Sequence, residues 1–226
     1  MSEAQWFVAQ AAKVSLLALL IAMAMRGRLG LCWSLTLYVV ATLVGNSLAT
    51  FWPQRFFNYN FWVLKQGVYD SLKIAVAIEL AWRAFSAFPG AWRIARVVIG
   101  VLLVASTLAV VWFTPRHWTY AQVWEWQPAV VTAGVWLLTA VALMVVLYQI
   151  PIGDWQRAIV LGFAPYMLAS VTLMNLLERR GWQVKQQVAL LDSVAFVGLI
   201  LFWTHAAWRQ EEPEREGEPV PVRSIA

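Results

Sequence analysis

The sequence predicts an all-α fold: a polytopic membrane protein built as a bundle of seven transmembrane helices. The first observation is composition. Of 226 residues, 61% are hydrophobic and only 13% are charged, whereas about a quarter of the residues in a soluble chain are charged. The second is that the apolar residues fall in runs of roughly 18 or more, the length that a helix needs to cross a bilayer core about 30 Å thick. Together they exclude a soluble globular domain and a disordered chain.

Each of these apolar stretches is expected to form one membrane-spanning helix. They are 6–25, 31–52, 61–82, 95–114, 127–148, 157–177 and 186–208. Short connectors with turn-forming or charged residues separate them, including Arg26-Gly27-Arg28, Pro53-Gln54-Arg55 and Arg179-Arg180-Gly181. Because no connector is long enough to fold as a second domain, residues 1–209 are expected to form one transmembrane domain.

The first two spans contain few polar residues. Lys13 lies inside the first span, and the second reads Tyr38-x-x-Ala41-Thr42 and then Asn46. A lysine at this depth has to find a partner or an aqueous surface, because a charge exposed to lipid is unfavourable.

The third span is polar on one face. At 100° per residue its polar side chains fall within an arc of about 140°; they are Lys65, Gln66, Tyr69, Asp70 and Lys73. The opposite face carries Gly67, Ser71 and Ala75 at four-residue spacing, a pattern that lets a neighbouring helix approach closely. We therefore expect the third span to lie near the centre of the bundle.

The last two spans add further polar candidates. Pro165 precedes Tyr166 within the sixth span, where a kink is expected, and Asp192 lies within the seventh. An ionised side chain at mid-membrane costs about 2.5–3.5 kcal/mol on insertion scales. Asp70, Lys73 and Asp192 should therefore face one another or a wet cavity. Lys65 and Glu79 are close enough to the span ends to reach the membrane surfaces.

These residues form the candidate site, which the sequence leaves open to two interpretations. Its members are Lys13, Asn46, Lys65, Tyr69, Asp70, Lys73, Tyr166 and Asp192. A fully paired network would fix helix packing, whereas an incompletely paired one would line a cavity for a solute, a proton or a ligand.

The distribution of basic residues predicts the orientation. With the N-terminus outside, the cytoplasmic connectors and the start of the tail hold more arginine than the outer ones do. The location predicted is a bacterial inner membrane. Tryptophan, present 15 times, gathers near span ends and is expected to anchor them at the two membrane surfaces, with only Trp136 near the middle of a span. The tail 210–226 is acidic and proline-rich, and it is expected to be a disordered cytoplasmic segment, either solvated or docked to a cytoplasmic partner.

Spans two and three share features with spans six and seven. Tyr38-x-x-Ala41-Thr42 corresponds to Tyr166-x-x-Ala169-Ser170, and Asp70-Ser71 corresponds to Asp192-Ser193. The order agrees, although the spacings differ. The pattern suggests a 3+1+3 pseudo-repeat, with two parallel three-helix units joined by an inverting fourth span.

Two known families resemble the chain in part. The 3+1+3 order resembles the SWEET sugar transporters in helix count and orientation, but their proline-glutamine signature is not matched, because Pro53-Gln54 follows the second span. The stretch 191–198 is similar to the retinal-carrying helix of microbial rhodopsins. Phe196 stands where that family has its lysine, so this resemblance implies no covalent chromophore.

A broader resemblance covers residues 26–209. The aromatic-rich turn 51–59 and the helix end at Arg83-Ala84-Phe85 resemble an uncharacterised family of bacterial seven-helix membrane proteins. This resemblance implies an orphan membrane protein and supplies no catalytic residues.

The sequence lacks the patterns of common enzymes. No phosphate-binding loop, dinucleotide fingerprint, zinc-protease motif or nucleophile elbow occurs, and the two histidines, His117 and His205, are expected at opposite membrane surfaces. We therefore expect no enzyme, no cofactor, no metal and no nucleic-acid partner. The functions that the sequence favours are small-solute transport or ligand binding. The alternatives are an accessory subunit bound to other membrane subunits and a seven-helix receptor.

Overall fold

The structure, a computed structural model, describes residues 3–56, 58–86, 120–147 and 152–209. Within these ranges the chain forms long α-helices and no strand, which confirms the all-α prediction. The long helices are α1 (Glu3–Met25), α2 (Trp33–Phe51), α4 (Tyr59–Ser86), α6 (Tyr120–Leu147), α7 (Asp154–Arg180) and α8 (Lys185–Trp208). Shorter elements connect them: η1 (Arg28–Gly30), α3 (Pro53–Phe56) and η2 (Trp182–Val184).

Four helices are both long enough and apolar enough to cross a membrane: Gln5–Met25, Trp33–Phe51, Asp154–Leu177 and Lys185–Trp208. They match the first, second, sixth and seventh predicted spans closely. Helix α4 covers the third predicted span and α6 covers almost all of the fifth. The predicted fourth span and the tail 210–226 lie outside the described residues.

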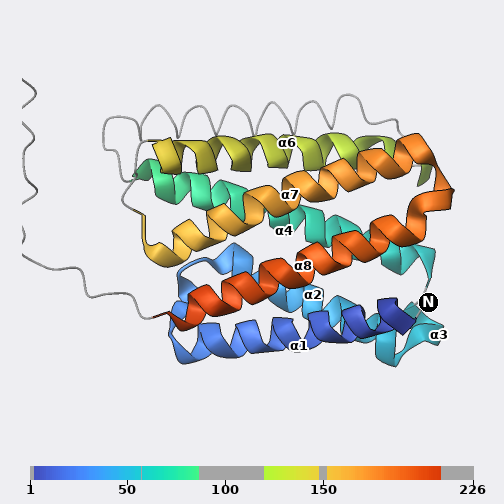
Figure 1. The fold of residues 1–226 in the computed structure, drawn as a ribbon, viewed down its shortest axis with the longest axis horizontal. Helices are drawn as coiled ribbons and strands as arrows, with labels where there is room; N and C mark the ends of the chain where they lie inside the picture. Colours follow the sequence, from blue (N-terminus) through green and yellow to red (C-terminus); the bar gives the residue numbers. More distant parts are fainter. Residues whose placement is uncertain (1–2, 57, 87–119, 148–151, 210–226) are drawn as a thin grey trace, which may run out of the picture.

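The long helices form a closed ring. Going around it, α1 contacts α2, α2 contacts α4, α4 contacts α6, α6 contacts α7, α7 contacts α8, and α8 returns to α1 (Figure 1). Helices joined by short connectors run antiparallel, whereas α4 and α6 run in the same direction. We call the end that carries α3 and the turn from α7 to α8 the α3 end. The opposite end, which carries η1 and the last turn of α8, is the Arg28 end.

The connectors follow their turn chemistry. Gly27 (φ 65°) and Gly181 (φ 72°) adopt the left-handed conformation that ends a helix and that glycine tolerates best. The predicted connector Pro53-Gln54-Arg55 forms most of the short helix α3 between α2 and α4. Pro53 is its first residue, where the fixed φ of proline suits a helix and its missing N–H leaves no bond unmade.

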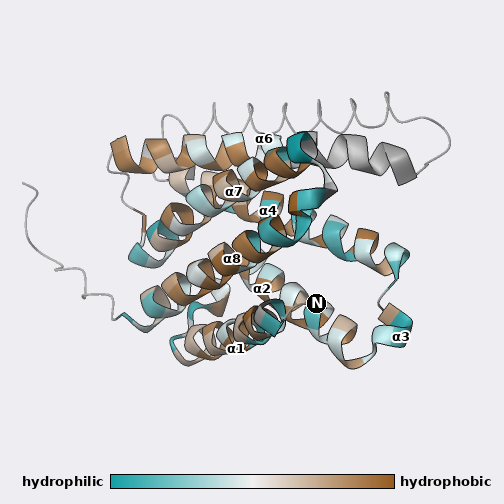
Figure 2. Cartoon of the chain, turned by 45° about the vertical axis from the view of Figure 1, so that its right-hand side comes forward, coloured by the Kyte–Doolittle hydropathy of each residue, from teal (hydrophilic) through white to brown (hydrophobic). Residues whose placement is uncertain are grey.

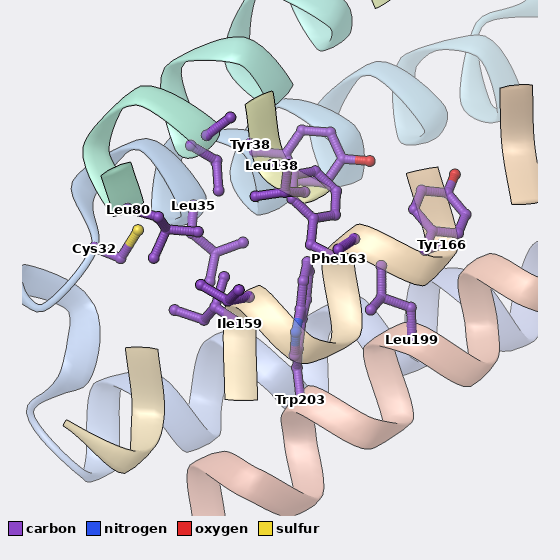
Figure 3. Packing of buried hydrophobic residues seen from close by; sticks show 14 of the residues in the cluster. Cys32, Leu35, Tyr38, Leu80, Leu138, Ile159, Phe163, Tyr166, Leu199 and Trp203 are labelled. Atoms are coloured by element: carbon purple, nitrogen blue, oxygen red, sulfur yellow. The ribbon is translucent and has the colours of Figure 1, made fainter. Parts of the chain in front are cut away.

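The tightly packed core fills the half of the bundle next to the Arg28 end. Every long helix contributes fully buried apolar side chains to it (Figure 3). Prominent members are Leu19, Leu35, Leu80, Leu138, Ile159 and Ile200. In Figure 2, hydrophobic residues cover the middle of α7 and α8, and hydrophilic ones gather where α7 turns into α8.

Two tryptophans depart from the predicted surface belt. Trp155 and Trp203 are 1% and 0% exposed, so they pack inside the core instead of anchoring the bundle at a membrane surface. Both lie on the inward face of their helix, and sequence position near a span end says nothing about that face. Other tryptophans near helix ends are exposed, as a belt requires: Trp6, Trp33, Trp52, Trp82 and Trp208.

Candidate functional site

The inward faces of α4 and α8 each carry charged side chains beyond the apolar core. In α4 the buried stripe runs from Ala84, Leu80 and Ala77 to Lys73 and Asp70. Spacings of three and four residues keep these side chains on one face of a helix. The stripe therefore carries an ion pair into the interior as it approaches the α3 end.

Helix α8 follows the same pattern. Its inward face runs from Ala207, Trp203 and Leu199 to Phe196 and then to Asp192. Four-residue spacing from Phe196 places Asp192 one turn further toward the α3 end, on the same face. The aspartate is thus the charged member of an otherwise apolar stripe.

Four aromatic rings mark the level where the change occurs. The ring centroids of Tyr38 (α2) and Phe163 (α7) are 5.8 Å apart, those of Phe163 and Tyr166 are 6.2 Å apart, and those of Tyr166 and Phe196 are 5.8 Å apart. Phe163 also contacts Trp203 from the core side, with centroids 5.5 Å apart. We call Tyr38, Phe163, Tyr166 and Phe196 the aromatic layer. The part of the bundle between it and the α3 end is called the polar half.

The tyrosine hydroxyls of this layer face away from the core. Figure 3 shows both of them on the side of the cluster farthest from Cys32, which lies at the Arg28 end. Asp192 and Asp70 are each close enough to interact electrostatically with Tyr38 and with Tyr166. Two carboxylates and two hydroxyls therefore share one region at the start of the polar half.

Asp70 and Lys73 form a buried ion pair within α4. Lys73 Nζ donates to Asp70 Oδ1 over 3.0 Å, and Gln66 Nε2 donates to the same carboxylate over 3.2 and 3.3 Å. Their side chains are 8% and 10% exposed. A buried pair of this kind is tolerated because each charge is balanced and hydrogen-bonded.

A second group of candidate residues lies at the contact between α2 and α4. Tyr69 Oη donates to the carbonyl of Thr42 over 3.2 Å, and Lys65 Nζ donates to Asn46 Oδ1 over 3.4 Å. Gly45 makes this contact possible, because a Cβ at its position would lie 2.5 Å from the Tyr69 hydroxyl. Asn46, Lys65 and Tyr69 thus fasten one side of the polar half.

Lys13 does not join these residues. Its Nζ donates to Thr50 Oγ1 over 2.7 Å and to Gln10 Oε1 over 3.3 Å, so it links α1 to the last turn of α2. Thr50 is exposed, which places this contact at the margin of the bundle.

Asp192 is the least compensated member of the site. Its Oδ1 atom is buried and accepts no hydrogen bond from any residue that the structure describes. Buried polar atoms are rarely left in this state, and those that are require an explanation. An unmet carboxylate oxygen inside a bundle is a candidate ligand position.

The polar half is also less tightly filled than the core. Beyond Met167 no described residue of α7 is buried, and before Leu199 the one buried residue of α8 is Val188. Asp192, Ala195 and Phe196 are all partly exposed although they lie on the inward face. The described chain therefore covers the inward face less completely around Asp192 than in the core.

Sequence reasoning missed several residues that organise the bundle. Ala41, Gly45 and Ala49 lie at four-residue spacing in the second span, and this small-residue pattern could have identified the close contact of α2 with α4. The similar pattern at Gly67 and Ser71 faces outward, and no described residue lies within 4 Å of a Cβ built on Gly67.

The Arg28 end holds two helix caps that were also missed. Glu79 accepts hydrogen bonds from Ser34 N (2.9 Å) and Trp33 N (3.3 Å), the first amides of α2, and pairs with Arg83 at 2.8 Å. Arg28 is 6% exposed and donates to the carbonyls of Ala206 (3.0 Å) and Arg209 (2.7 Å) at the end of α8. Each charged side chain is opposite in sign to the partial charge at the helix end that it caps.

Within the described residues, no three histidine, cysteine, aspartate or glutamate side chains gather as a metal site requires. No protein-family model, curated protein or solved structure matches the chain. The site therefore has to be interpreted from its own chemistry.

Proposed function

We propose that this chain is a seven-helix membrane protein whose polar half binds a small solute, and that it acts as a carrier or a ligand-binding membrane protein. The observation that carries the proposal is the carboxylate of Asp192 on the inward face of α8, within electrostatic reach of Tyr38 and Tyr166. A paired network that only fixed packing would leave no carboxylate oxygen unmet, whereas Asp192 Oδ1 has no described partner. The expected setting is a bacterial inner membrane, with the N-terminus and the α3 end outside.

The direction of the helices supports seven crossings. Helix α4 ends at the Arg28 end and α6 begins at the α3 end, so the two run parallel. Residues 87–119, which contain the apolar stretch 95–114, connect these opposite ends. A chain that crosses the membrane in both α4 and α6 needs one more crossing between them, and this stretch has the required length.

The arrangement of corresponding residues supports the 3+1+3 pseudo-repeat. Tyr38 and Tyr166 were matched by sequence, as were Asp70 and Asp192, and all four lie in one electrostatic neighbourhood. A repeat about an axis along the bundle brings equivalent residues to the same depth on opposite sides of a shared centre. Transporters built from repeats bind their substrates at such a centre.

An accessory subunit is the second candidate. Trp136 lies near the middle of α6 and is 71% exposed, a depth at which an indole N–H in lipid finds no acceptor. Contact with a neighbouring membrane protein would satisfy it.

Substituted-cysteine accessibility tests the proposal. In a Cys32→Ser background, single cysteines at Asn46 and Ser170 report on the polar half, and a cysteine at Ile159 serves as the buried control. We expect a membrane-impermeant cationic thiol reagent to modify the first two and to leave Ile159→Cys unreacted. If Asn46→Cys and Ser170→Cys are as inert as the control, the bundle is dry and the carrier proposal fails.

Purification in mild detergent tests the alternative. A carrier is expected to purify without a stoichiometric protein partner. A partner present at constant ratio, and lost on Trp136→Leu substitution, would favour the accessory subunit.

A further inference from the structure

We propose that Asp192, together with the aromatic layer, forms a binding site for an organic ammonium group. This inference rests on the proposed function and deepens it, because it names the chemical class of the solute.

Asp192 is the one acidic residue of the candidate site without a basic partner among the described residues. Asp70 is neutralised by Lys73 at 3.0 Å, and Glu79 lies in the other half, paired with Arg83. Lys65 and Lys13 donate to the neutral oxygens of Asn46 and Thr50, and neither forms an ion pair with Asp192 among the described residues. A bound cation would compensate this carboxylate, whereas an anion would be repelled and a neutral solute would leave the charge unpaired.

The walls of the site favour an organic cation over a metal ion. Phe196 lies one turn from Asp192 on the same face of α8 and packs against Tyr166, with ring centroids 5.8 Å apart. A cation is attracted to an aromatic face within about 6 Å of its centroid. Metal ions such as Ca²⁺ instead require six or more oxygen ligands, and the described residues gather no three metal-binding side chains.

The neighbours of Asp192 suit a primary ammonium. Buried Val188 lies one turn toward the α3 end on the same stripe, and Phe196 one turn toward the core. The three N–H donors of a primary ammonium can serve the carboxylate and the hydroxyls of Tyr38 and Tyr166, which lie within electrostatic reach of Asp192.

Ligand-induced thermal stabilisation of the detergent-purified full chain tests the inference. The probes are benzylammonium and its neutral isostere benzyl alcohol, with methylammonium as a probe without a ring. We expect saturable stabilisation by benzylammonium, weaker stabilisation by methylammonium and none by benzyl alcohol. Equal stabilisation by benzyl alcohol, or none by either amine, would overturn the proposal.

Two pairs of variants locate the site. Asp192→Asn is expected to weaken benzylammonium binding about tenfold or more, because it removes a charge-assisted hydrogen bond, while Asp154→Asn, at an exposed carboxylate of α7, leaves it unchanged. Phe196→Leu is expected to weaken binding of benzylammonium more than of methylammonium. The matched change Phe202→Leu, at a side chain 44% exposed, should have no effect. Undiminished binding by a folded Asp192→Asn variant would place the amine elsewhere and refute the inference.

Two further experiments identify the source of the ammonium group and distinguish failure of this inference from failure of the proposed function. The lipid headgroup is tested by measuring thermal stability in nanodiscs with phosphatidylethanolamine and in nanodiscs with phosphatidylcholine alone. If only phosphatidylethanolamine stabilises the protein, and Asp192→Asn abolishes this effect, the ligand is an ammonium group and its source is a lipid headgroup. Reactive cysteines at Asn46 and Ser170 without any response to amines would refute the ammonium inference and leave the proposed solute site standing. Inert cysteines would instead refute the proposed function itself.

Discussion

At the scale of single residues, the contact of α2 with α4 depends on one missing side chain. Tyr69 Oη and the methylene groups of Lys65 occupy the space beside Gly45, where a Cβ would meet them at 2.5 and 3.2 Å. Both of these side chains hold polar contacts across the helix pair. The position of the polar candidates on α4 thus rests on a glycine in its neighbour.

We expect Gly45→Ala to destabilise the protein by about 1–3 kcal/mol, the usual penalty for overpacking. The added methyl group would push Tyr69 away from the Thr42 carbonyl. Gly67→Ala is the matched control: its Cβ would meet no described residue within 4 Å, and alanine favours a helix by about 1 kcal/mol relative to glycine. The free energy of unfolding in mixed micelles measures both. A neutral Gly45→Ala variant would contradict the close contact.

At the scale of helices, charged side chains join neighbouring helix termini at the Arg28 end. Arg28 bonds two carbonyls at the end of α8, and its guanidinium lies 5.6 Å from the centroid of the Trp155 ring on α7. One side chain of η1 thus ties the connector between α1 and α2 to α7 and α8, which are distant from it in the sequence. In the same way Glu79 of α4 supplies the N-terminal cap that Cys32, the residue preceding α2, does not provide.

We expect Arg28→Gln to destabilise the bundle by about 2–3 kcal/mol, because it removes charged hydrogen bonds from buried carbonyls. Arg26→Gln is the control: Arg26 is exposed, and its guanidinium lies 5.6 Å from the centroid of the Trp208 ring, so its loss should cost about 0.5–1 kcal/mol. Thermal unfolding followed by size-exclusion chromatography compares the two variants. Equal losses would mean that the cap contributes little.

Helix positions could be predicted because each is encoded locally. Runs of apolar residues placed the first, second, sixth and seventh spans close to the observed helices. The caps and the face of each tryptophan could not be predicted in this way. Arg28 meets Ala206 across 178 residues of sequence, and Trp203 is buried because of the helices around it. Such contacts depend on which helices become neighbours.

Part of the candidate site could be predicted from one rule: a charged side chain inside a membrane is unfavourable unless it has a partner. That rule singled out Asp70, Lys73 and Asp192, and the structure pairs the first two at 3.0 Å. It did not say which carboxylate would lack a partner, because that depends on the rotation of α8. Nor did it identify Tyr38 and Phe163, whose roles arise from the ring contacts of the aromatic layer.

At the scale of the whole molecule, the parallel directions of α4 and α6 make a topological prediction. If both helices cross the membrane, an odd total of crossings places the two termini on opposite sides. The basic residues favour the Arg28 end as the cytoplasmic one by a small margin. Among the described residues, this end holds Arg26, Arg28, Arg83, Arg157 and Arg209, and the α3 end holds Arg55, Arg179, Arg180 and Lys185.

Fusions test this directly. Alkaline phosphatase joined after Arg55 in α3 is expected to be active, because this enzyme folds only outside the cytoplasm. Green fluorescent protein joined after Ala226 is expected to fluoresce, because it folds in the cytoplasm and does not become fluorescent when the general secretory route exports it. The reverse pattern would invert the orientation and place the polar half toward the cytoplasm. A phosphatase active at both positions would mean an even number of crossings between them, so at least one of the five proposed crossings after Arg55 would not span the membrane. The first helix to be reassigned would be α4, which is not among the four described helices that are long and apolar enough to cross a membrane.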